Sequence, residues 1–344
     1  MNIITLNKPS VLKYGAVLLV FLGWSAIAFS QDTLAKTQVH EQQNVNETVP
    51  RATPIGKRAE RKQLMRFLKS LNFPEVDYNE SDDNQWRHLA ALFTRLRLYP
   101  LAMKCFLKTL SPDSLVNSDI PITNSDQQNI QSQLIITAKE VAPIKSNIIK
   151  VDSILEKFKD GKKALSYALI LHVKQAVRGT PRVHKFIYTG HTFITLIKFN
   201  TDSSYASFTF GFGPHKDNLL AATPIIPSSS SKFTDDGTHN WDEVVGKFIS
   251  KRRFERILKL TKQYDGLTYN LNSNNCTDFG LKAARLGGLE VRETKGYWPL
   301  GAGNNPGVTG KSILLGKFNN MDTGNFEKLF IDTARIAPIE VTVH

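Results

Sequence analysis

Cys276 stands where a thiol can act as a nucleophile. Asn274 and Asn275 precede it and are residue types favoured as helix N-caps, while Phe279 and Ala283 follow at helical spacing. The sequence therefore predicts Cys276 in the first turn of a helix, where the partial positive charge favours a thiolate over a thiol. A thiolate is the nucleophile that acyl transfer needs, and free N–H groups of the same turn can hold a developing oxyanion.

His191 is the candidate proton partner among the eight histidines of the chain. It follows Gly190, which permits a close approach of the backbone, and it opens a segment rich in Thr, Phe and Ile that predicts a strand. A histidine at a strand end facing a cysteine at a helix start is the papain-type arrangement of base and nucleophile. A hydrogen-bonded histidine with only a structural role is the alternative for His191.

Other roles stay open for the residues around the thiol. Cys276 also fits a buried structural cysteine or a disulfide with Cys105, the second of the two cysteines in the chain. Asn275 fits a helix cap better than an orienting partner of the histidine. The sequence has no paired cysteines and no closely spaced histidines with a carboxylate, so neither a metal nor an organic cofactor is expected.

Four motifs in the second half of the chain resemble, in this order, one protein superfamily. They are GHTFITL from Gly190, FGFGP from Phe210, NNCTDF from Asn274 and NPGVTG from Asn305. The histidine strand precedes the cysteine helix, which is the reverse of the order in papain. Residues 164–315 therefore resemble the circularly permuted branch of the papain-like thiol hydrolases, which includes cell-wall peptidase-like and lecithin:retinol acyltransferase-like proteins. Within that branch the motifs resemble a group of bacterial exported or toxin-associated proteins.

The resemblance implies Cys276 as the nucleophile and His191 as the base. It also implies a third polar residue on the strand after the histidine. That strand offers Ser207 and Thr209, with His215 just beyond them. Thr209 and Asn275 are the tentative additional site residues.

The predicted fold class is α+β: a small antiparallel sheet packed on the cysteine-bearing helix, preceded by a helical region. Strands are predicted at residues 167–173, 186–199 and 205–212. A basic helix follows the N-cap candidate Ser250, and its Lys and Arg side chains fit a solvated face or, alternatively, an anion-binding surface. Asn305-Pro-Gly by itself predicts a turn.

The first thirty residues have the pattern of a secretory signal peptide. Lys8 and Lys13 precede a short apolar run, and Ala28-Phe29-Ser30 places small residues at a cleavage site. An uncleaved membrane anchor is the alternative, although the run is shorter than the about 20 apolar residues that span a bilayer. The expected localisation is exported (periplasmic, cell-envelope or secreted), with no transmembrane span after cleavage.

The region after the signal peptide divides by composition. Trp86, Phe93 and Phe106 match packing positions of a single tetratricopeptide repeat, and an ordinary helical hairpin is the alternative. The predicted segments are a signal peptide at 1–30, a flexible linker at 31–57, a helical hairpin region at 58–115, a connector at 116–163, the hydrolase-like domain at 164–320 and a C-terminal tail at 321–344.

The formal net charge of +13 favours acidic surfaces but identifies no partner. These features predict an exported cysteine hydrolase of peptidase or amidase type that cleaves an amide or ester in a peptide, cell-wall or acyl substrate. No nucleic-acid partner is expected, and the N-terminal helical region is a candidate surface for a protein partner. The alternative is a non-catalytic cell-envelope binding module on a papain-like scaffold.

Overall fold

The computed structural model of the protein describes residues 83–110, 120–123, 126, 128, 147–185, 188–215 and 220–332. All of them belong to one compact unit, Pro54–His344. The predicted signal peptide, the linker and the first part of the helical hairpin region lie outside the described residues.

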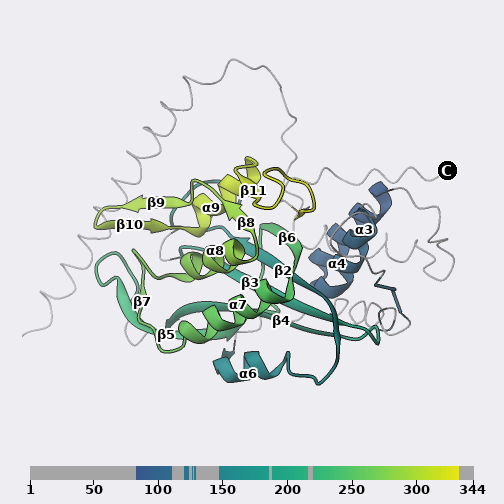
Figure 1. Cartoon of the computed structure of the whole chain (residues 1–344). Coiled ribbons are helices and arrows are strands. Elements are labelled where there is room, and N and C mark those ends of the chain that lie inside the picture. The colour runs from purple at the N-terminus through teal and green to yellow at the C-terminus, as the bar shows by residue number, and fades with distance from the viewer. Residues whose placement is uncertain are drawn as a thin grey trace, which may run out of the picture. The chain divides into compact units, whose positions relative to one another are not determined.

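The centre of the fold is an eight-stranded sheet, shown in Figure 1, in which every pairing is antiparallel. Its order is β1-β5-β4-β3-β2-β6-β12, and β7 pairs with β5. The strands are β1 (Ile148–Ile149), β2 (Ala164–Lys174), β3 (His191–Asn200), β4 (Tyr205–His215), β5 (Ser228–Asp235), β6 (Glu243–Ile249), β7 (Tyr269–Asn270) and β12 (Phe330–Asp332). Helices and an antiparallel sheet thus confirm the predicted α+β class.

Helices and two small ribbons accompany this sheet. The helices are α3 (Asp83–Arg95), α4 (Tyr99–Leu107), α6 (Val151–Glu156), α7 (Lys251–Gln263), α8 (Cys276–Leu286) and α9 (Pro306–Leu314). The ribbons pair β8 (Leu289–Val291) with β11 (Phe318–Asn320), and β9 (Lys295–Trp298) with β10 (Gly301–Asn304).

Alternation along the central strands divides their side chains between two cores. Ile194 and Leu196 of β3 are fully buried in one core together with Phe279 of α8. Ile197 of the same strand lies in the other core, which contains Phe106 of α4. The helix that bears Cys276 and the α3–α4 pair therefore cover opposite faces of the sheet.

The sheet extends beyond the range 164–320 predicted for the domain. On the N-terminal side, β1 pairs with β5, and Val151 and Ile154 of α6 are buried in the core of α8. On the C-terminal side, β12 pairs with β6. Segments that composition assigned to a connector and a tail thus supply edge strands, because a two- or three-residue strand leaves little hydrophobic pattern to detect.

The predicted turn at Asn305 is wrong, since this residue begins a helix. Its side-chain Oδ1 accepts hydrogen bonds from the N–H groups of Gly307 (2.8 Å) and Val308 (3.3 Å), which makes it the N-cap of α9. Pro306 follows in the first turn, where a missing N–H costs nothing. The same Asn-Pro-Gly string suits a turn and a capped helix start, and only the residues after it decide between them.

Candidate active site

Cys276 is the first residue of α8, as the sequence predicts. Asn275 is its N-cap: its Oδ1 accepts hydrogen bonds from the N–H of Thr277 (2.8 Å) and of Asp278 (3.1 Å). Asp278 completes the capping box by accepting from the N–H of Asn275 at 2.9 Å. The amide nitrogen of Asn275 donates to the carbonyls of Leu271 (2.9 Å) and Asn304 (2.8 Å). All hydrogen-bonding groups of the Asn275 side chain are thus used to fix the helix start.

His191 is the first residue of β3, where it pairs with Lys174 of β2. Gly190 before it has a φ of +86°, and a Cβ there would lie 2.3 Å from the carbonyl oxygen of Lys174. Only glycine combines this conformation with this contact. Gly190 therefore directs the chain into β3 so that His191 falls at the end of this central strand.

Asp236 is the partner of His191. The Nε2 atom of His191 lies 3.0 Å from Oδ2 of Asp236, whose side chain is 1% exposed. Asp236 follows the last residue of β5, and its second oxygen accepts a hydrogen bond from the Thr234 hydroxyl at 3.1 Å. Since Nε2 faces the carboxylate, Nδ1 is the ring nitrogen left for the thiol.

Gly211 of β4 makes room for this pair. A Cβ at this position would lie 2.4 Å from Oδ2 of Asp236 and 2.6 Å from Nε2 of His191. Both distances are shorter than any ordinary contact, so a side chain here would displace one partner. The first glycine of FGFGP is thus needed because a side chain there would occupy the space of the His191–Asp236 pair.

Cys276 and His191 are close enough to shift each other's pKa. Burial alone raises the pKa of the Cys276 thiol, but the interaction with the His191 ring and its positive charge outweighs burial and lowers that pKa from 9.0. The hydrogen-bonding contact of the sulfur itself is with the Thr277 hydroxyl at 3.9 Å. Burial lowers the pKa of His191, whereas the charge of Asp236 and hydrogen bonds to Asp236 and Cys276 raise it from 6.5 to about 10. Both shifts favour the thiolate–imidazolium form of the pair over the neutral form.

The pKa shifts of Cys276 and His191 differ in direction from those of the second cysteine and of the adjacent His239. Burial raises the pKa of Cys105, so this second free cysteine stays protonated inside α4. The ring of His239 lies 5.0 Å from that of His191, but burial and the charge of His191 lower its pKa to about 4. His239 is therefore neutral near pH 7, and His191 is the imidazole that carries charge.

Threonines hold the start of α8 against β3. The hydroxyls of Thr192 and Thr277 lie 3.1 Å apart, and both residues are fully buried. A Cβ on Gly280 would lie 2.6 Å from the methyl carbon of Thr192, so glycine permits the close approach of helix and strand. The backbone N–H of Thr192 also helps to lower the pKa of the Cys276 thiol.

Thr209 lies behind the site rather than in it, which corrects the prediction of a third residue on β4. Its carbonyl accepts a hydrogen bond from the N–H of Asp236 at 3.1 Å. Its hydroxyl lies 2.8 Å from that of Thr195, which in turn lies 2.8 Å from Nε2 of the fully buried His172. Thr209 supports the backbone of Asp236, and the carboxylate of Asp236 is the group that meets His191.

The other candidates on β4 make no hydrogen bond with His191 among the described contacts. Ser207 pairs with Ile197, six residues along β3 from His191, and His215 is the last residue of β4, where it pairs with Ser230 of β5. Sequence reasoning missed Asp236 because it searched the strand that follows the histidine. The usable signal was Asp-Asp-Gly after the serine-rich segment 228–234, but an acidic turn of this kind is most simply a solvated loop.

One N–H of the first helical turn is left for an incoming oxygen. Asn275 occupies the N–H groups of Thr277 and Asp278, whereas the N–H of Cys276 faces the hydroxyl of Tyr269. Burial raises the pKa of Tyr269, so this hydroxyl keeps its proton. The Cys276 N–H and the Tyr269 hydroxyl are thus two neutral groups that contact each other, and an incoming oxygen must replace that contact to bind them.

Within the described ranges, no group of three or more His, Cys, Asp and Glu side chains could hold a metal ion. No helix in the same ranges is long and apolar enough to cross a membrane. No protein-family model, no curated protein and no solved structure matches the chain.

Proposed function

We propose that the protein is a cysteine hydrolase that cleaves an amide or ester through a Cys276 thiolate. The observation that carries this proposal is the series of side chains from Cys276 to His191 to Asp236, with the thiol pKa lowered and the imidazole pKa raised. An unused buried ion pair is costly to maintain, so a strongly shifted thiol–imidazole pair favours a catalytic role.

In the proposed reaction the thiolate attacks the carbonyl carbon, a C–S bond forms, and the carbonyl electrons move onto oxygen. The tetrahedral species collapses, and the His191 imidazolium gives its proton to the departing amine or alcohol. Water then attacks the thioester while neutral His191 takes a proton from it, and the carboxylic acid leaves as the thiolate is restored. Asp236 orients the imidazole and stabilises its charge throughout.

The oxyanion of this reaction would be held by the N–H of Cys276 and the hydroxyl of Tyr269. Both groups lie beside the sulfur, and neither carries a charge that must be neutralised first. Donors fixed before the reaction stabilise the developing charge without reorganisation.

The order of histidine strand and cysteine helix supports a circularly permuted papain-like domain. The sheet, the helix that opens with Cys276 and the histidine at the start of β3 fit that class. The resemblance points to the branch with cell-wall peptidase-like and acyltransferase-like members, so we propose a peptide, cell-wall or acyl substrate. A signal peptide would deliver the enzyme to the periplasm, the cell envelope or the medium.

A binding module on the same scaffold is the second candidate, and the low exposure of the site favours it. Cys276 is 6% exposed and the side chain of His191 is 15% exposed. A substrate carbonyl must reach the sulfur, so catalysis requires that the loops above the site admit it. A binding module does not need that access.

A p-nitrophenyl ester is a probe that separates the two candidates. The hydrolase should release p-nitrophenol in a burst of about one equivalent, and mass spectrometry should find the acyl group on Cys276. Cys276→Ser, which is nearly isosteric, should fold and lose the burst, and His191→Ala should slow it strongly. Equal release by the wild type and both variants would remove the hydrolase proposal and leave the binding module.

A further inference from the structure

A large groove lies along α7, at the end of the sheet away from Cys276. Its volume is about 1510 Å³, more than the about 300–1,000 Å³ typical of small-molecule sites. One wall is α7, and the other is the segment 158–167 that leads from α6 into β2. Ten of the lining residues are Lys or Arg, against the two carboxylates Glu255 and Asp322.

Most of these cations already have partners. Lys162 lies 2.9 Å from Asp202, and Arg253 makes two contacts of 2.6 Å with Asp322. Lys262 lies 2.8 Å from Asp152. In each pair the carboxylate neutralises the cation, so these cations contribute little to the attraction of an anionic ligand.

Four cations of the groove make no side-chain hydrogen bond or ion pair with any residue that the structure describes: Lys163, Arg252, Arg256 and Lys259. The three on α7 follow one another at intervals of four and three residues, so they share one face of the helix. With a rise of 1.5 Å per residue they span about 10 Å along the groove. Guanidinium groups in such a row suit phosphate oxygens.

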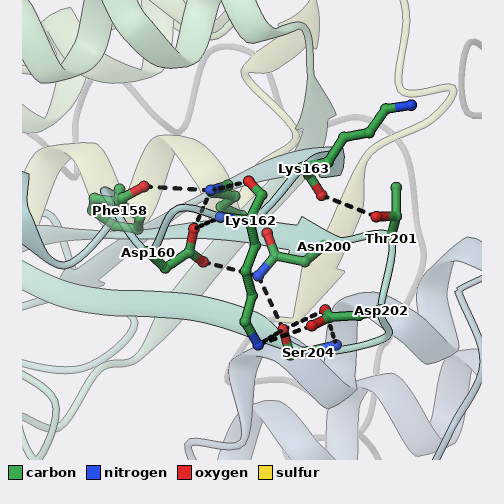
Figure 2. A network of polar contacts seen from close by, with 9 residues as sticks. Phe158, Asp160, Lys162, Lys163, Asn200, Thr201, Asp202 and Ser204 are labelled. Carbon is green, nitrogen blue, oxygen red and sulfur yellow. Dashed lines mark hydrogen bonds and ion pairs between the residues drawn. The ribbon is translucent and has the colours of Figure 1, made fainter.

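A polar network fixes the opposite wall, as Figure 2 shows. Asp160 accepts hydrogen bonds from the ammonium of Lys198, from the Asn200 side chain (2.8 Å) and from the N–H of Lys162 (3.0 Å). The carbonyl of Lys163 accepts from the N–H of Thr201 at 3.0 Å, while its ammonium points away from the network. The wall is therefore preorganised and leaves one cation directed outward.

The floor of the groove is apolar. Phe158 and Phe254 meet edge to face with ring centroids 5.1 Å apart, and Tyr167 packs on Phe254 at 4.6 Å. Phe158 and Phe254 are buried, and the apolar side chains that the groove leaves partly exposed above them are Leu155, Tyr167 and Leu258. An apolar floor below cationic walls suits a molecule that has an alkyl part and an anionic group.

We infer that this groove binds an anionic phospholipid, with its acyl chain on the partly exposed Leu155, Tyr167 and Leu258 and its phosphate among Lys163, Arg252 and Arg256. A polyanion without alkyl groups would leave the apolar floor in water, and a zwitterionic lipid would leave the row of cations unmatched. A phospholipid has an alkyl chain for the apolar floor and a phosphate for the cations of the walls.

This binding site is separate from Cys276. Tyr167 lines the groove, whereas Lys174, seven residues further along the same strand, pairs with His191. At about 3.3 Å per residue these positions are about 23 Å apart. The inference therefore does not depend on the hydrolase proposal, and either can fail alone.

The test is calorimetric titration of the full-length protein with short-chain lipids below their micelle concentration. Dihexanoyl-phosphatidylglycerol should bind one to one. Dihexanoyl-phosphatidylcholine, which has the same chains without net charge, and glycerol phosphate, which has no chains, should each bind at least tenfold more weakly. Arg252→Gln/Arg256→Gln/Lys259→Gln should weaken binding of the first lipid at least tenfold.

The matched control is Arg292→Gln/Lys295→Gln/Lys328→Gln, which removes the same charge from exposed positions outside the groove. It should bind like the wild type. Equal binding of the two lipids, equal loss in both triple variants, or displacement of the lipid by a short oligodeoxythymidine would each overturn the inference. The last result would identify a nucleic-acid site instead.

Discussion

Nε2 of His191 lies 3.0 Å from Oδ2 of Asp236, and this contact joins the start of β3 to the turn after β5. The carboxylate is almost fully buried, so its charge acts on the imidazole with little screening by water. Burial raises the pKa of Asp236, yet the charge of His191 and their hydrogen bond hold it below 3.8. Asp236 is therefore charged at neutral pH, where it stabilises the imidazolium of His191.

Asp236→Asn should weaken the thiolate. The amide keeps the shape but removes the charge that raises the His191 pKa, so the imidazolium loses its proton at lower pH. Alkylation of Cys276 at pH 6 should slow at least tenfold. Asp235→Asn is the matched control, because Asp235 accepts only from the Gly237 N–H among the described contacts (3.0 Å). Equal rates in the two variants would show that Asp236 has no special role.

Gly211→Ala should disrupt the same contact by steric overlap. The added methyl would lie within 2.6 Å of both His191 and Asp236, whereas a methyl at Gly213 of the same strand meets nothing within 4 Å. We expect at least a tenfold loss of Cys276 reactivity for Gly211→Ala and near wild-type reactivity for Gly213→Ala. Circular dichroism should report folded protein in both. If both variants react alike, the predicted crowding at Gly211 is absent.

Asn275→Ala should destabilise the fold and also lower the reactivity of the Cys276 thiol. Loss of a helix N-cap costs about 0.5–2 kcal/mol in the free energy of unfolding. Ser250, whose side chain caps α7, offers a control of similar cost at a helix without the thiol. Urea unfolding should detect both losses, while only Asn275→Ala should slow Cys276 alkylation. A slower reaction in Ser250→Ala of the same size would mean that general destabilisation explains the effect.

His172 predicts an acid-sensitive fold. Burial lowers its pKa to about 3, so below pH 6.5 the unfolded chain binds a proton that the folded protein excludes. Stability is therefore lost as the pH falls from 6.5 toward 3, by about 2 kcal/mol between pH 7 and pH 5. His172→Gln should lose less over this interval in urea unfolding. An unchanged pH dependence in the variant would contradict a neutral buried His172.

Much of the site can be read from local sequence. The cap at Asn275, the helix start at Cys276 and the strand start at His191 depend on neighbouring residues, and the structure confirms all three. The same holds for Ser250 and the basic helix after it. The alternation of phenylalanines predicts β4, since Phe208, Phe210 and Phe212 share the face that packs on the core of α8.

The rest depends on contacts between distant segments. Asp236 meets His191 only because β5 pairs with β4 and β4 with β3, and no local pattern encodes that order. Gly211 has the same origin, since the atoms it avoids belong to other segments. The edge strands β1 and β12 have two and three residues, which is too short for a periodic signal. The predicted signal peptide lies outside the described residues and stays a prediction.

The pH dependence of cysteine alkylation tests the central claim most directly. Native protein is treated with iodoacetamide between pH 5 and pH 9, and peptide mapping gives separate rates for Cys276 and Cys105. We expect Cys276 to react already at mildly acidic pH with an apparent pKa below 9.0, and Cys105 to stay protected until unfolding. His191→Ala should slow the reaction of Cys276. Equal labelling of both cysteines, an unreactive Cys276, or a rate unaffected by His191→Ala would contradict the thiolate–imidazolium pair.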